Sequence, residues 1–434
     1  MGKGQKLWKT AKTVIPGGNM LLSKRPEQFL PDLWPAYYSR AKGCRVWDLD
    51  DREYIDMSIM GIGCNTLGYG HPEVDEAVMR TIELGNMSTL NAPEEVELAQ
   101  RLIELHPWAD MARFARTGGE ANAIAIRIAR AASGRDGVAL CGYHGWHDWY
   151  LAANLGDEEK LAGHLLPGLS ANGVPQSLRG SVFPFAYNDA DGLEELIRTQ
   201  NIGVIKMEVS RNFEPKGDFL VRARQIADAH NVILIFDECT SGFRQALGGL
   251  HKVYGVDPDM AVFGKALGNG YAITGVIGKR DIMEAAQGTF ISSTFWTERI
   301  GSVAGVATLG VMEREKSWDT ITATGRDITA RWQALGQRYG LPLTTAGVPA
   351  LTSFGFKTKK AQAYKTLVTQ EMLEKGYLAA TSVYTCTEHT PAIVDGYFEA
   401  LEPVFALIRD CEDGRDVMGL LKGPVAHASF TRLN

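Results

Sequence analysis

Two adjacent carboxylates end an apolar run in NVILIFDECTSGFR, residues 231–244. The apolar part, VILIF, is typical of a strand buried on both faces, as the central strands of parallel sheets are. Asp237 would then stand at the carboxyl end of a buried strand. Because an unpaired buried carboxylate costs much free energy, Asp237 requires a positively charged partner. A protonated nitrogen in a bound ring is one such partner.

A lysine in a glycine-rich loop is the second candidate for chemistry. FGKALGNGYAITG, residues 263–275, places Lys265 directly after the short apolar strand MAVF. One interpretation is that its ammonium group simply extends into solvent. The other is that the amine is partly desolvated, which lowers its pKa and makes it a competent nucleophile for a Schiff base.

The third candidate is a strand that runs into glycines and then directly into a helix. FARTGGEANAIAIRIAR contains Thr117, Gly118 and Gly119 at this junction. The glycines let a ligand approach the backbone, and the helix start offers free N–H groups and a positive dipole end to a phosphate. A tight turn with an N-cap explains the same residues. The segment has neither the GK[ST] of a Walker motif nor the GxGxxG pattern.

An aromatic segment, CGYHGWHDWY at residues 141–150, follows a further predicted strand. His144 and His147 are three residues apart, but no third ligand with regular spacing accompanies them, so we expect no metal. Tyr143 can offer a flat surface to a planar ring. Aromatic packing between helices is the alternative interpretation of this segment.

Three motifs, namely the lysine loop, the glycine junction and the aromatic segment, predict one cofactor together with Asp237. Pyridoxal phosphate requires a phosphate cradle, an aromatic platform, a carboxylate at the pyridine nitrogen and a lysine that forms a Schiff base. Asp237 would keep the ring nitrogen protonated, so that the ring can draw electrons from a carbanion beside it.

The elements that position these residues alternate along the chain. From about residue 73 to 315 helical patterns alternate with apolar strand patterns, which predicts an α/β domain with a mainly parallel sheet. In such a sheet, ligands bind beyond the carboxyl ends of the strands. After about residue 316, long helical segments and short strands predict a smaller α+β domain. We expect residues 1–60 to be part of that smaller domain, residues 61–315 to form the large domain, and residues 316–434 to complete the small one.

Bulk properties exclude several classes of protein. The chain has 434 residues, a formal net charge of -6 and six widely spaced cysteines. The net charge argues against a dedicated nucleic-acid binder, and the cysteines suit free thiols in a reducing compartment. The N-terminus has no apolar signal region, and no apolar stretch is long enough for a membrane helix. We therefore expect a cytoplasmic protein with no membrane and no nucleic-acid partner.

The order TGGEA, YHG, DECTSGFR and FGKALGNG resembles the class III pyridoxal-phosphate aminotransferases, and most closely their glutamate-1-semialdehyde aminomutase branch. The usual forms in that family are SGTEA, YHG, DEV..GFR and GKA.GGG. The likeness extends from about residue 15 to 315 and includes IPGG and GYGHPEV. It implies a fold-type I transferase, with a large domain on a mostly parallel, seven-stranded sheet and a smaller α+β domain.

The resemblance also implies roles for single residues. Lys265 would be the lysine that binds the coenzyme, and Asp237 would pair with the pyridine nitrogen. Tyr143 would stack on one ring face, and Cys239 stands where the family has a valine against the other. His144, in the same YHG motif, would also belong to the cofactor site.

Further residues would hold the phosphate and complete the site. Gly118 and Gly119, next to Thr117, would bind phosphate through the backbone, although Gly119 replaces the family's threonine and loses its hydroxyl. Glu208 matches a glutamate near the ring, or is simply an exposed acid at a strand end. Thr294 matches a threonine that reaches the phosphate of the neighbouring subunit, which implies a homodimer.

The departures from the aminomutase pattern bear on the substrate. Lys24 and Arg25 stand near, but not at, the position of an arginine for the substrate carboxylate. Glu388 is not in the place of the glutamate that gates an aminomutase site.

We therefore expect an aminotransferase with an amino-acid donor, glutamate being a candidate, and an aldehyde or ketone acceptor. Trp296, Arg211 and Asn212 make a sugar-like acceptor a candidate. An aminomutase, which moves the amino group within one molecule, is the alternative activity. A cofactor-binding protein without turnover and a nucleotide-binding α/β protein are the alternatives from other classes.

Overall fold

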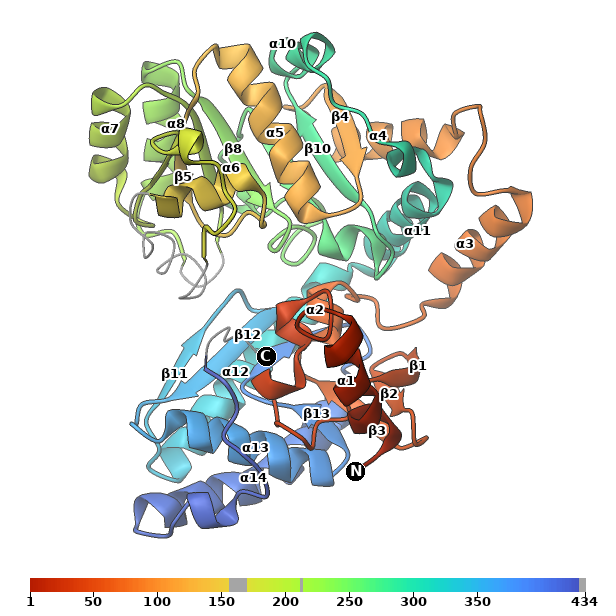
Figure 1. The fold of residues 1–434 in the computed structure, drawn as a ribbon, viewed down its shortest axis with the longest axis vertical. Coiled ribbons are helices and arrows are strands. Elements are labelled where there is room, and N and C mark those ends of the chain that lie inside the picture. Colours follow the sequence, from red (N-terminus) through yellow and green to blue (C-terminus); the bar gives the residue numbers. More distant parts are fainter. Residues whose placement is uncertain (156–169, 211–213, 429–434) are drawn as a thin grey trace. The chain divides into compact units, whose positions relative to one another are not determined.

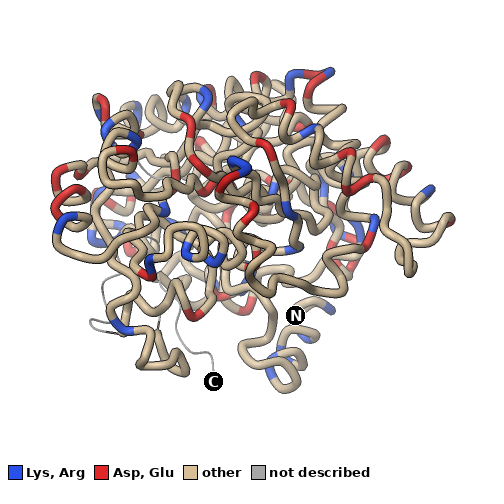
Figure 2. The backbone as a smooth tube through the Cα atoms, turned by 90° about the horizontal axis from the view of Figure 1, so that it is seen from above, with Lys and Arg blue, Asp and Glu red and all other residues tan. Residues whose placement is uncertain are grey.

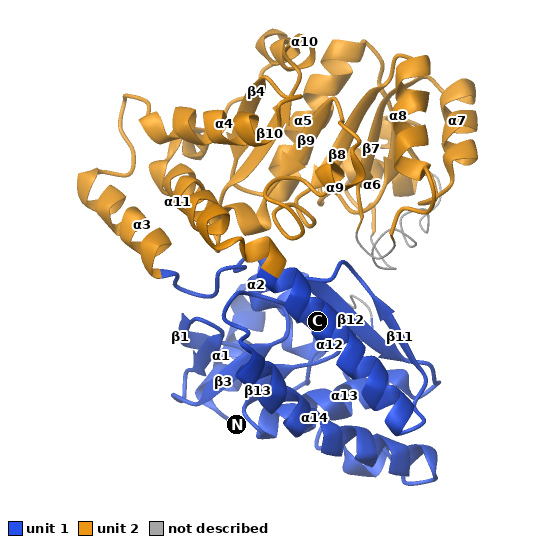
Figure 3. Ribbon diagram, turned by 180° about the vertical axis from the view of Figure 1, so that it is seen from behind, with its two compact units in different colours: residues 1–71, 320–434 blue, residues 72–319 orange. Residues whose placement is uncertain are grey.

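The structure is a computed structural model that describes residues 1–155, 170–210 and 214–428. The chain divides into two compact units (Figure 3). Unit 1 comprises residues 1–71 and 320–434, and unit 2 comprises residues 72–319. The domain boundaries expected from the sequence, 60/61 and 315/316, stay predictions.

Unit 2 is built on a seven-stranded sheet with the strand order β4-β10-β9-β8-β7-β5-β6. β10 runs antiparallel to β4 and β9, and the remaining neighbours pair in parallel. The predicted mostly parallel, seven-stranded sheet is confirmed. The strands are β4 Met111–Ala115, β5 Gly137–Cys141, β6 Val182–Pro184, β7 Ile202–Glu208, β8 Ile233–Glu238, β9 Met260–Phe263 and β10 Thr274–Gly278.

Every residue of β5, β7, β8, β9 and β10 is buried. This is the pattern of strands covered on both faces, which the near-continuous apolar runs predict. Ionisable side chains in such strands are therefore exceptions that need partners.

Helix α5, Gly118–Ser133, lies across one face of this sheet (Figure 1). Its buried face includes Ile124, Ala125, Ile128 and Ala129, which pack with strand residues in one hydrophobic cluster. The other helices of unit 2 are α3 Pro72–Leu84, α4 Pro93–Leu105, α6 Asp148–Leu151, α7 Ala190–Thr199, α8 Phe219–Ala229, α9 His251–Tyr254, α10 Arg280–Met283 and α11 Arg299–Glu315.

Unit 1 joins the two ends of the chain in one sheet. Its four-stranded sheet has the order β1-β2-β3-β13, in which β13 pairs in parallel with β3, and a three-stranded sheet has the order β11-β12-β14. The strands are β1 Tyr38–Lys42, β2 Arg45–Asp48, β3 Glu53–Met57, β11 Leu343–Ala346, β12 Leu351–Phe356, β13 Tyr377–Ala379 and β14 Ser382–Tyr384. The helices are α1 Lys3–Val14, α2 Met60–Gly63, α12 Ser317–Arg338, which begins in unit 2, α13 Ala361–Glu374 and α14 Pro391–Glu412.

Lysine and arginine are interspersed with aspartate and glutamate along the described backbone (Figure 2). In the same part of the chain, none of the helices combines the length and the apolar character that crossing a membrane requires.

Candidate active site

Asp237 lies near the end of β8, and its carboxylate is held from several sides. Oδ2 accepts hydrogen bonds from Asn122 Nδ2 at 2.8 Å and from His144 Nδ1 at 2.7 Å. Oδ1 accepts the backbone N–H of Cys239 at 3.0 Å. Because an ionised carboxylate offers about four acceptor positions, two on each oxygen, Oδ1 keeps a position for one further donor.

The charge on this carboxylate is stabilised although the group is buried. Burial alone would raise the pKa of Asp237, but the Lys206 ammonium, 3.8 Å from Oδ2, and the hydrogen bonds from His144 and the Cys239 N–H outweigh it. They hold the pKa of Asp237 well below its usual range. Asp237 is therefore ionised at neutral pH.

Lys265 follows the end of β9 in a short 3₁₀ turn, Lys265–Gly268. Its amine donates a hydrogen bond to Thr240 Oγ1 at 2.7 Å, which brings it beside the turn that follows Asp237. The backbone of Lys265 has a φ of +44°, a conformation that side-chain-bearing residues rarely adopt and that the surroundings must maintain. The amine is thus placed by both its backbone and its hydroxyl partner.

The glycine pair opens α5 as the sequence predicts. Thr117 is the N-cap, and its hydroxyl accepts the N–H of Glu120 at 3.3 Å, while the Glu120 carboxylate accepts the N–H of Thr117 at 2.8 Å. This capping box satisfies the N–H groups of Thr117 and Glu120. The N–H groups of Gly118 and Gly119 are left at the positive end of a 16-residue helix, where an anion binds.

The loop after β5 packs directly on this helix start. A Cβ on Gly119 would lie 2.8 Å from His147 Nδ1, and one on Gly145 would lie 2.8 Å from the Cα of Gly119. His147 Nδ1 is itself buried and has no hydrogen-bond partner within the described residues. Burial lowers the pKa of His147, so the ring is a neutral donor or acceptor beside the cradle.

Tyr143 and Glu208 are connected through the backbone. The N–H of Tyr143 donates to Glu208 Oε2 at 3.1 Å, and Gly142, with a φ of +113°, leaves room for that carboxylate, since a Cβ there would lie 2.6 Å from Oε2. Glu208 is buried and stands opposite Asp237 in the parallel register of β7 and β8. The expectation of an exposed acid at this strand end is therefore wrong.

The Cys239 thiol lies between the cradle and the lysine loop. Its sulfur is 3.5 Å from the position that a Cβ on Gly118 would take and 3.4 Å from that on Gly264. Burial, followed by the charge of Asp237, raises the pKa of Cys239 well above its usual value, so the thiol is neutral. This neutral thiol also hydrogen-bonds the Asp237 carboxylate.

The segment with Thr294 and Trp296 reaches the outer side of the cradle. Trp296 Nε1 donates to Glu120 Oε1 at 3.3 Å, and the Arg116 guanidinium donates to the carbonyl oxygen of Trp296 at 2.8 Å. Thr294 is exposed at the start of the turn Thr294–Thr297, apart from the residues around Asp237. Arg211 and Asn212 lie outside the described residues.

Three side chains of this site were not predicted: Asn122, Lys206 and Thr240. Lys206 left a signal, because it is the one charged residue within the apolar run IGVIKM. Asn122 also left one, as a polar residue among alanines and isoleucines on the buried face of α5. Thr240 follows the DEC triplet and gave no signal of its own.

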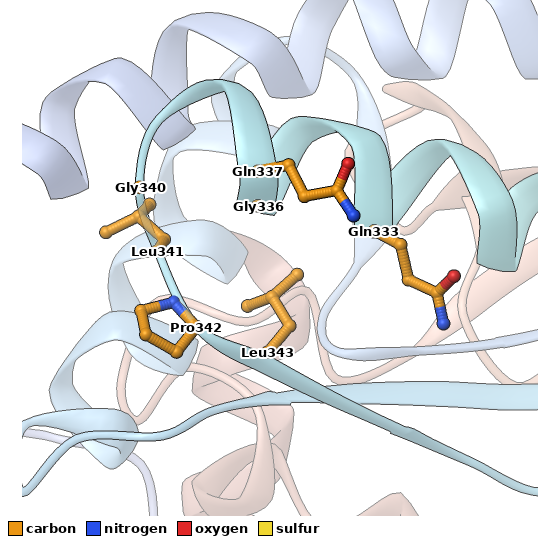
Figure 4. Close-up of a pocket in the computed structure, with 7 residues that line it drawn as sticks. All are labelled: Gln333, Gly336, Gln337, Gly340, Leu341, Pro342 and Leu343. Carbon is orange, nitrogen blue, oxygen red and sulfur yellow. The ribbon is translucent and has the colours of Figure 1, made fainter.

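A separate hollow lies in unit 1, between the end of α12 and the start of β11 (Figure 4). Leu341, Pro342 and Leu343 face Gln333 and Gln337 across it, with Gly336 and Gly340 at its end. Its lining has no titratable side chain and none of the predicted site residues.

Residues 31–394 match the family model described as aminotransferase class-III. The 3-aminobutyryl-CoA aminotransferase of Cloacimonas acidaminovorans (strain Evry) is 34% identical over 380 residues, which cover 85% of this chain and 87% of that protein. The glutamate-1-semialdehyde 2,1-aminomutase of Methanococcoides burtonii is 32% identical over 347 residues, 76% of this chain and 78% of that protein.

Among solved structures, the pyridoxal-phosphate internal aldimine form of the FumI protein from Sphingopyxis sp. MTA144 superposes with a TM-score of 0.86. It is 26% identical, and the match covers 97% of this chain and 100% of that one.

Proposed function

The chain belongs to the class-III aminotransferase family, and we propose that it moves an amino group from an amino-acid donor to an aldehyde or ketone at the site around Asp237 and Lys265. One observation supports this proposal most strongly. Two strand ends place the ionised, buried carboxylate of Asp237 and the amine of Lys265 beside one glycine cradle. Because the chain belongs to this family, the protein is an enzyme and its coenzyme is pyridoxal phosphate.

The residues present fit this coenzyme. Asp237 Oδ1 keeps an acceptor position that suits a protonated pyridine nitrogen, and Lys265 offers a primary amine for the aldehyde. The start of α5 offers the N–H groups of Gly118 and Gly119 to a phosphate, with the unpartnered His147 Nδ1 beside them.

When bound, the coenzyme supplies an aldehyde that condenses with amines and a ring that accepts electrons from the adjoining carbon. Asp237 would hold the proton on the ring nitrogen, which would strengthen that electron demand. With the coenzyme bound, Lys265 Nζ would act as the general base and acid that moves the proton of the donor's Cα. Thr240 orients that amine through its hydroxyl.

The remaining residues bind and orient the ring. Tyr143 would stack on one face, and the neutral Cys239 thiol would lie against the other. Glu208, tied to the Tyr143 N–H, fixes the loop that carries this aromatic platform.

We propose a homodimer in which Thr294 contributes to the phosphate site of the partner copy. Its exposure leaves it available to a second chain. Exposed apolar side chains along α3, the following connector and the start of α4 support an interface in unit 2: Met79, Ile82, Leu84, Met87, Leu90 and Val96.

We propose the substrates by chemical class. Glutamate is the candidate donor, and Trp296, beside the cradle, supports an acceptor with a polar or ring-shaped body. The name of the Cloacimonas relative adds 3-aminobutyryl-CoA as an amine to be tested.

The second candidate is a glutamate-1-semialdehyde aminomutase, which the Methanococcoides relative favours. In unit 1, Glu388 packs beside Gly43 and Gly68, where any Cβ would meet its side chain at 3.2 Å and 2.6 Å. Glu388 is thus packed against glycines of the N-terminal segment within unit 1.

Borohydride reduction of the coenzyme-loaded enzyme, followed by peptide mapping, tests the site. We expect the coenzyme on Lys265, and a label on any other lysine overturns the assignment. Glutamate and a panel of aldehydes then distinguish the activities. A transaminase releases 2-oxoglutarate, whereas an aminomutase releases no keto acid and converts glutamate-1-semialdehyde alone.

A further inference from the structure

Lys206 is a buried lysine for which the proposed mechanism has no role. It lies in the middle of β7, its side chain is 0% exposed, and its ammonium has no hydrogen-bond partner within the described residues. In the parallel register it stands opposite Leu140 of β5 and Ile235 of β8, so its stem passes through the apolar layer between the sheet and α5. An isolated ammonium in such surroundings costs a large amount of free energy.

The Asp237 carboxylate compensates the charge of the Lys206 ammonium. Lys206 Nζ lies 3.8 Å from Asp237 Oδ2, too far for a hydrogen bond but close enough for a strong attraction in a buried site. Burial lowers the pKa of Lys206, and Asp237, then Cys239 and Glu208, act in the opposite direction. His144, on the other side of Oδ2, is the remaining titratable neighbour of this carboxylate.

The Lys206 ammonium lies 3.8 Å from Oδ2, the oxygen that also accepts from Asn122 and His144. Oδ1 accepts the Cys239 N–H, and the Cys239 thiol also hydrogen-bonds this carboxylate. A ligand atom bound at Oδ1 would therefore contact the other oxygen of the carboxylate, not the one nearest to the ammonium. The positive charge of the Lys206 ammonium lowers the proton affinity of the carboxylate more than that of the ligand atom at Oδ1.

We propose that Lys206 is a positioning residue that keeps on the pyridine nitrogen the proton that this nitrogen shares with Asp237. The inference rests on the proposed pairing of Asp237 with the ring. Without the ammonium, the proton moves toward the carboxylate and the ring withdraws fewer electrons, so the proton transfer at the donor's Cα slows.

The test uses holoenzyme loaded with coenzyme labelled with ¹⁵N in the ring, and compares wild type with Lys206→Met by NMR. We expect the ring ¹⁵N signal of Lys206→Met to move toward that of an unprotonated pyridine. We also expect kcat to fall about tenfold for each unit of lost proton affinity, with KM unchanged. Lys279→Met is the matched control, because Lys279 pairs with Asp259 at 2.7 Å outside the site. It should leave the signal in place.

Asp237→Asn separates this inference from the proposed function. If wild type and Asp237→Asn give the same ring signal, the pairing of Asp237 with the ring is wrong. If these two differ but Lys206→Met keeps the wild-type signal, only the role of Lys206 is overturned. Should Lys206→Met not fold, Lys206→Gln keeps a polar but uncharged side chain for the same measurement.

Unfolding of the coenzyme-free protein gives an independent readout. Lys206→Met leaves Asp237 without its cation, and Asp237→Asn leaves Lys206 without its anion, so each variant should unfold at lower urea concentration than wild type. The double variant removes both charges and should regain part of the combined loss. Losses that simply add would show that the two groups do not interact, and would overturn the proposal.

Discussion

At the scale of single residues, the site depends on one carboxylate that remains charged in a buried place. Asp237 achieves this because it accepts hydrogen bonds from Asn122, His144 and the Cys239 N–H, and because the Lys206 ammonium lies 3.8 Å from Oδ2. Buried charged groups cost free energy, and groups with perturbed pKa values cluster at functional sites. The arrangement therefore supports the proposed role of Asp237 more strongly than its position in the sequence does.

Asp237→Asn tests that assignment, because it keeps the shape and a hydrogen-bonding oxygen but removes the charge. We expect kcat to fall by roughly three orders of magnitude, about 4 kcal/mol of transition-state stabilisation, while circular dichroism shows a folded protein. Near-normal turnover in this variant would contradict the proposed role of the carboxylate.

At the scale of elements, the start of α5 accepts no side chain at Gly119. A Cβ there would meet the His147 ring at 2.8 to 2.9 Å, so Gly119→Ala forces the loop after β5 away from the cradle. We expect weaker coenzyme binding by about 1–3 kcal/mol, the usual cost of overpacking, measured by titrating the coenzyme-free protein with pyridoxal phosphate.

Gly310→Ala is the matched control for this change. Gly310 lies within α11, and a Cβ there would meet nothing within 4 Å. The substitution should leave coenzyme affinity unchanged and raise the stability of the fold slightly, since alanine is the better helix residue. Equal affinity losses in both variants would mean that the effect is not local to the cradle.

His106, at the C-terminal end of α4, predicts how stability depends on pH. Its Nδ1 donates to the carbonyl oxygen of Leu102 at 2.7 Å, and its Nε2 accepts the N–H of Gly249 at 3.0 Å, so only the neutral ring satisfies both bonds. Burial lowers the pKa of His106 to about 4. Because the unfolded chain binds this proton near pH 6.5, acid favours unfolding between about pH 6.5 and 4, by about 3 kcal/mol in total.

Urea unfolding at several pH values measures this slope. Wild type should lose stability as the pH falls through that range, and His106→Gln should lose less over the same range although it starts lower. Parallel curves for the two proteins would show that His106 does not titrate in this window.

Many elements follow from the sequence because their patterns are local. The apolar spacing predicts a helix over residues 93–105, which is α4, and the alanine-rich helix at 119–133 is α5, begun one residue earlier. Strand ends and glycines likewise pointed to Asp237, Lys265 and a phosphate cradle, whose roles stay predictions. The partners of these residues did not follow, because Asn122 and Asp237 are 115 residues apart and meet only once the sheet and α5 have packed.

At the scale of the whole molecule, local sequence patterns also fail to predict the long-range contacts of unit 1 and the association of two copies of the chain. The parallel pairing of β3 with β13 joins residues 53–57 to residues 377–379, a contact that no local pattern announces. The apolar residues along α3 are equally ambiguous in the sequence, since alternating helical patterns predict a buried face for each helix. In the structure Met79, Ile82 and Leu84 of α3 are exposed, and so is Leu90 in the connector that follows, which is 82% exposed.

Leu90→Lys tests whether a second copy covers this surface. We expect wild type to sediment as a dimer and the variant, which would bury an unpaired charge, to sediment as a monomer at micromolar concentration. The monomer should also release pyridoxal phosphate more readily, because Thr294 of one copy would no longer reach the other. Val221→Lys, on α8, adds the same charge at an exposed apolar position outside this surface and should remain dimeric. A monomeric wild type that retains its coenzyme would remove both the dimer and the shared role of Thr294.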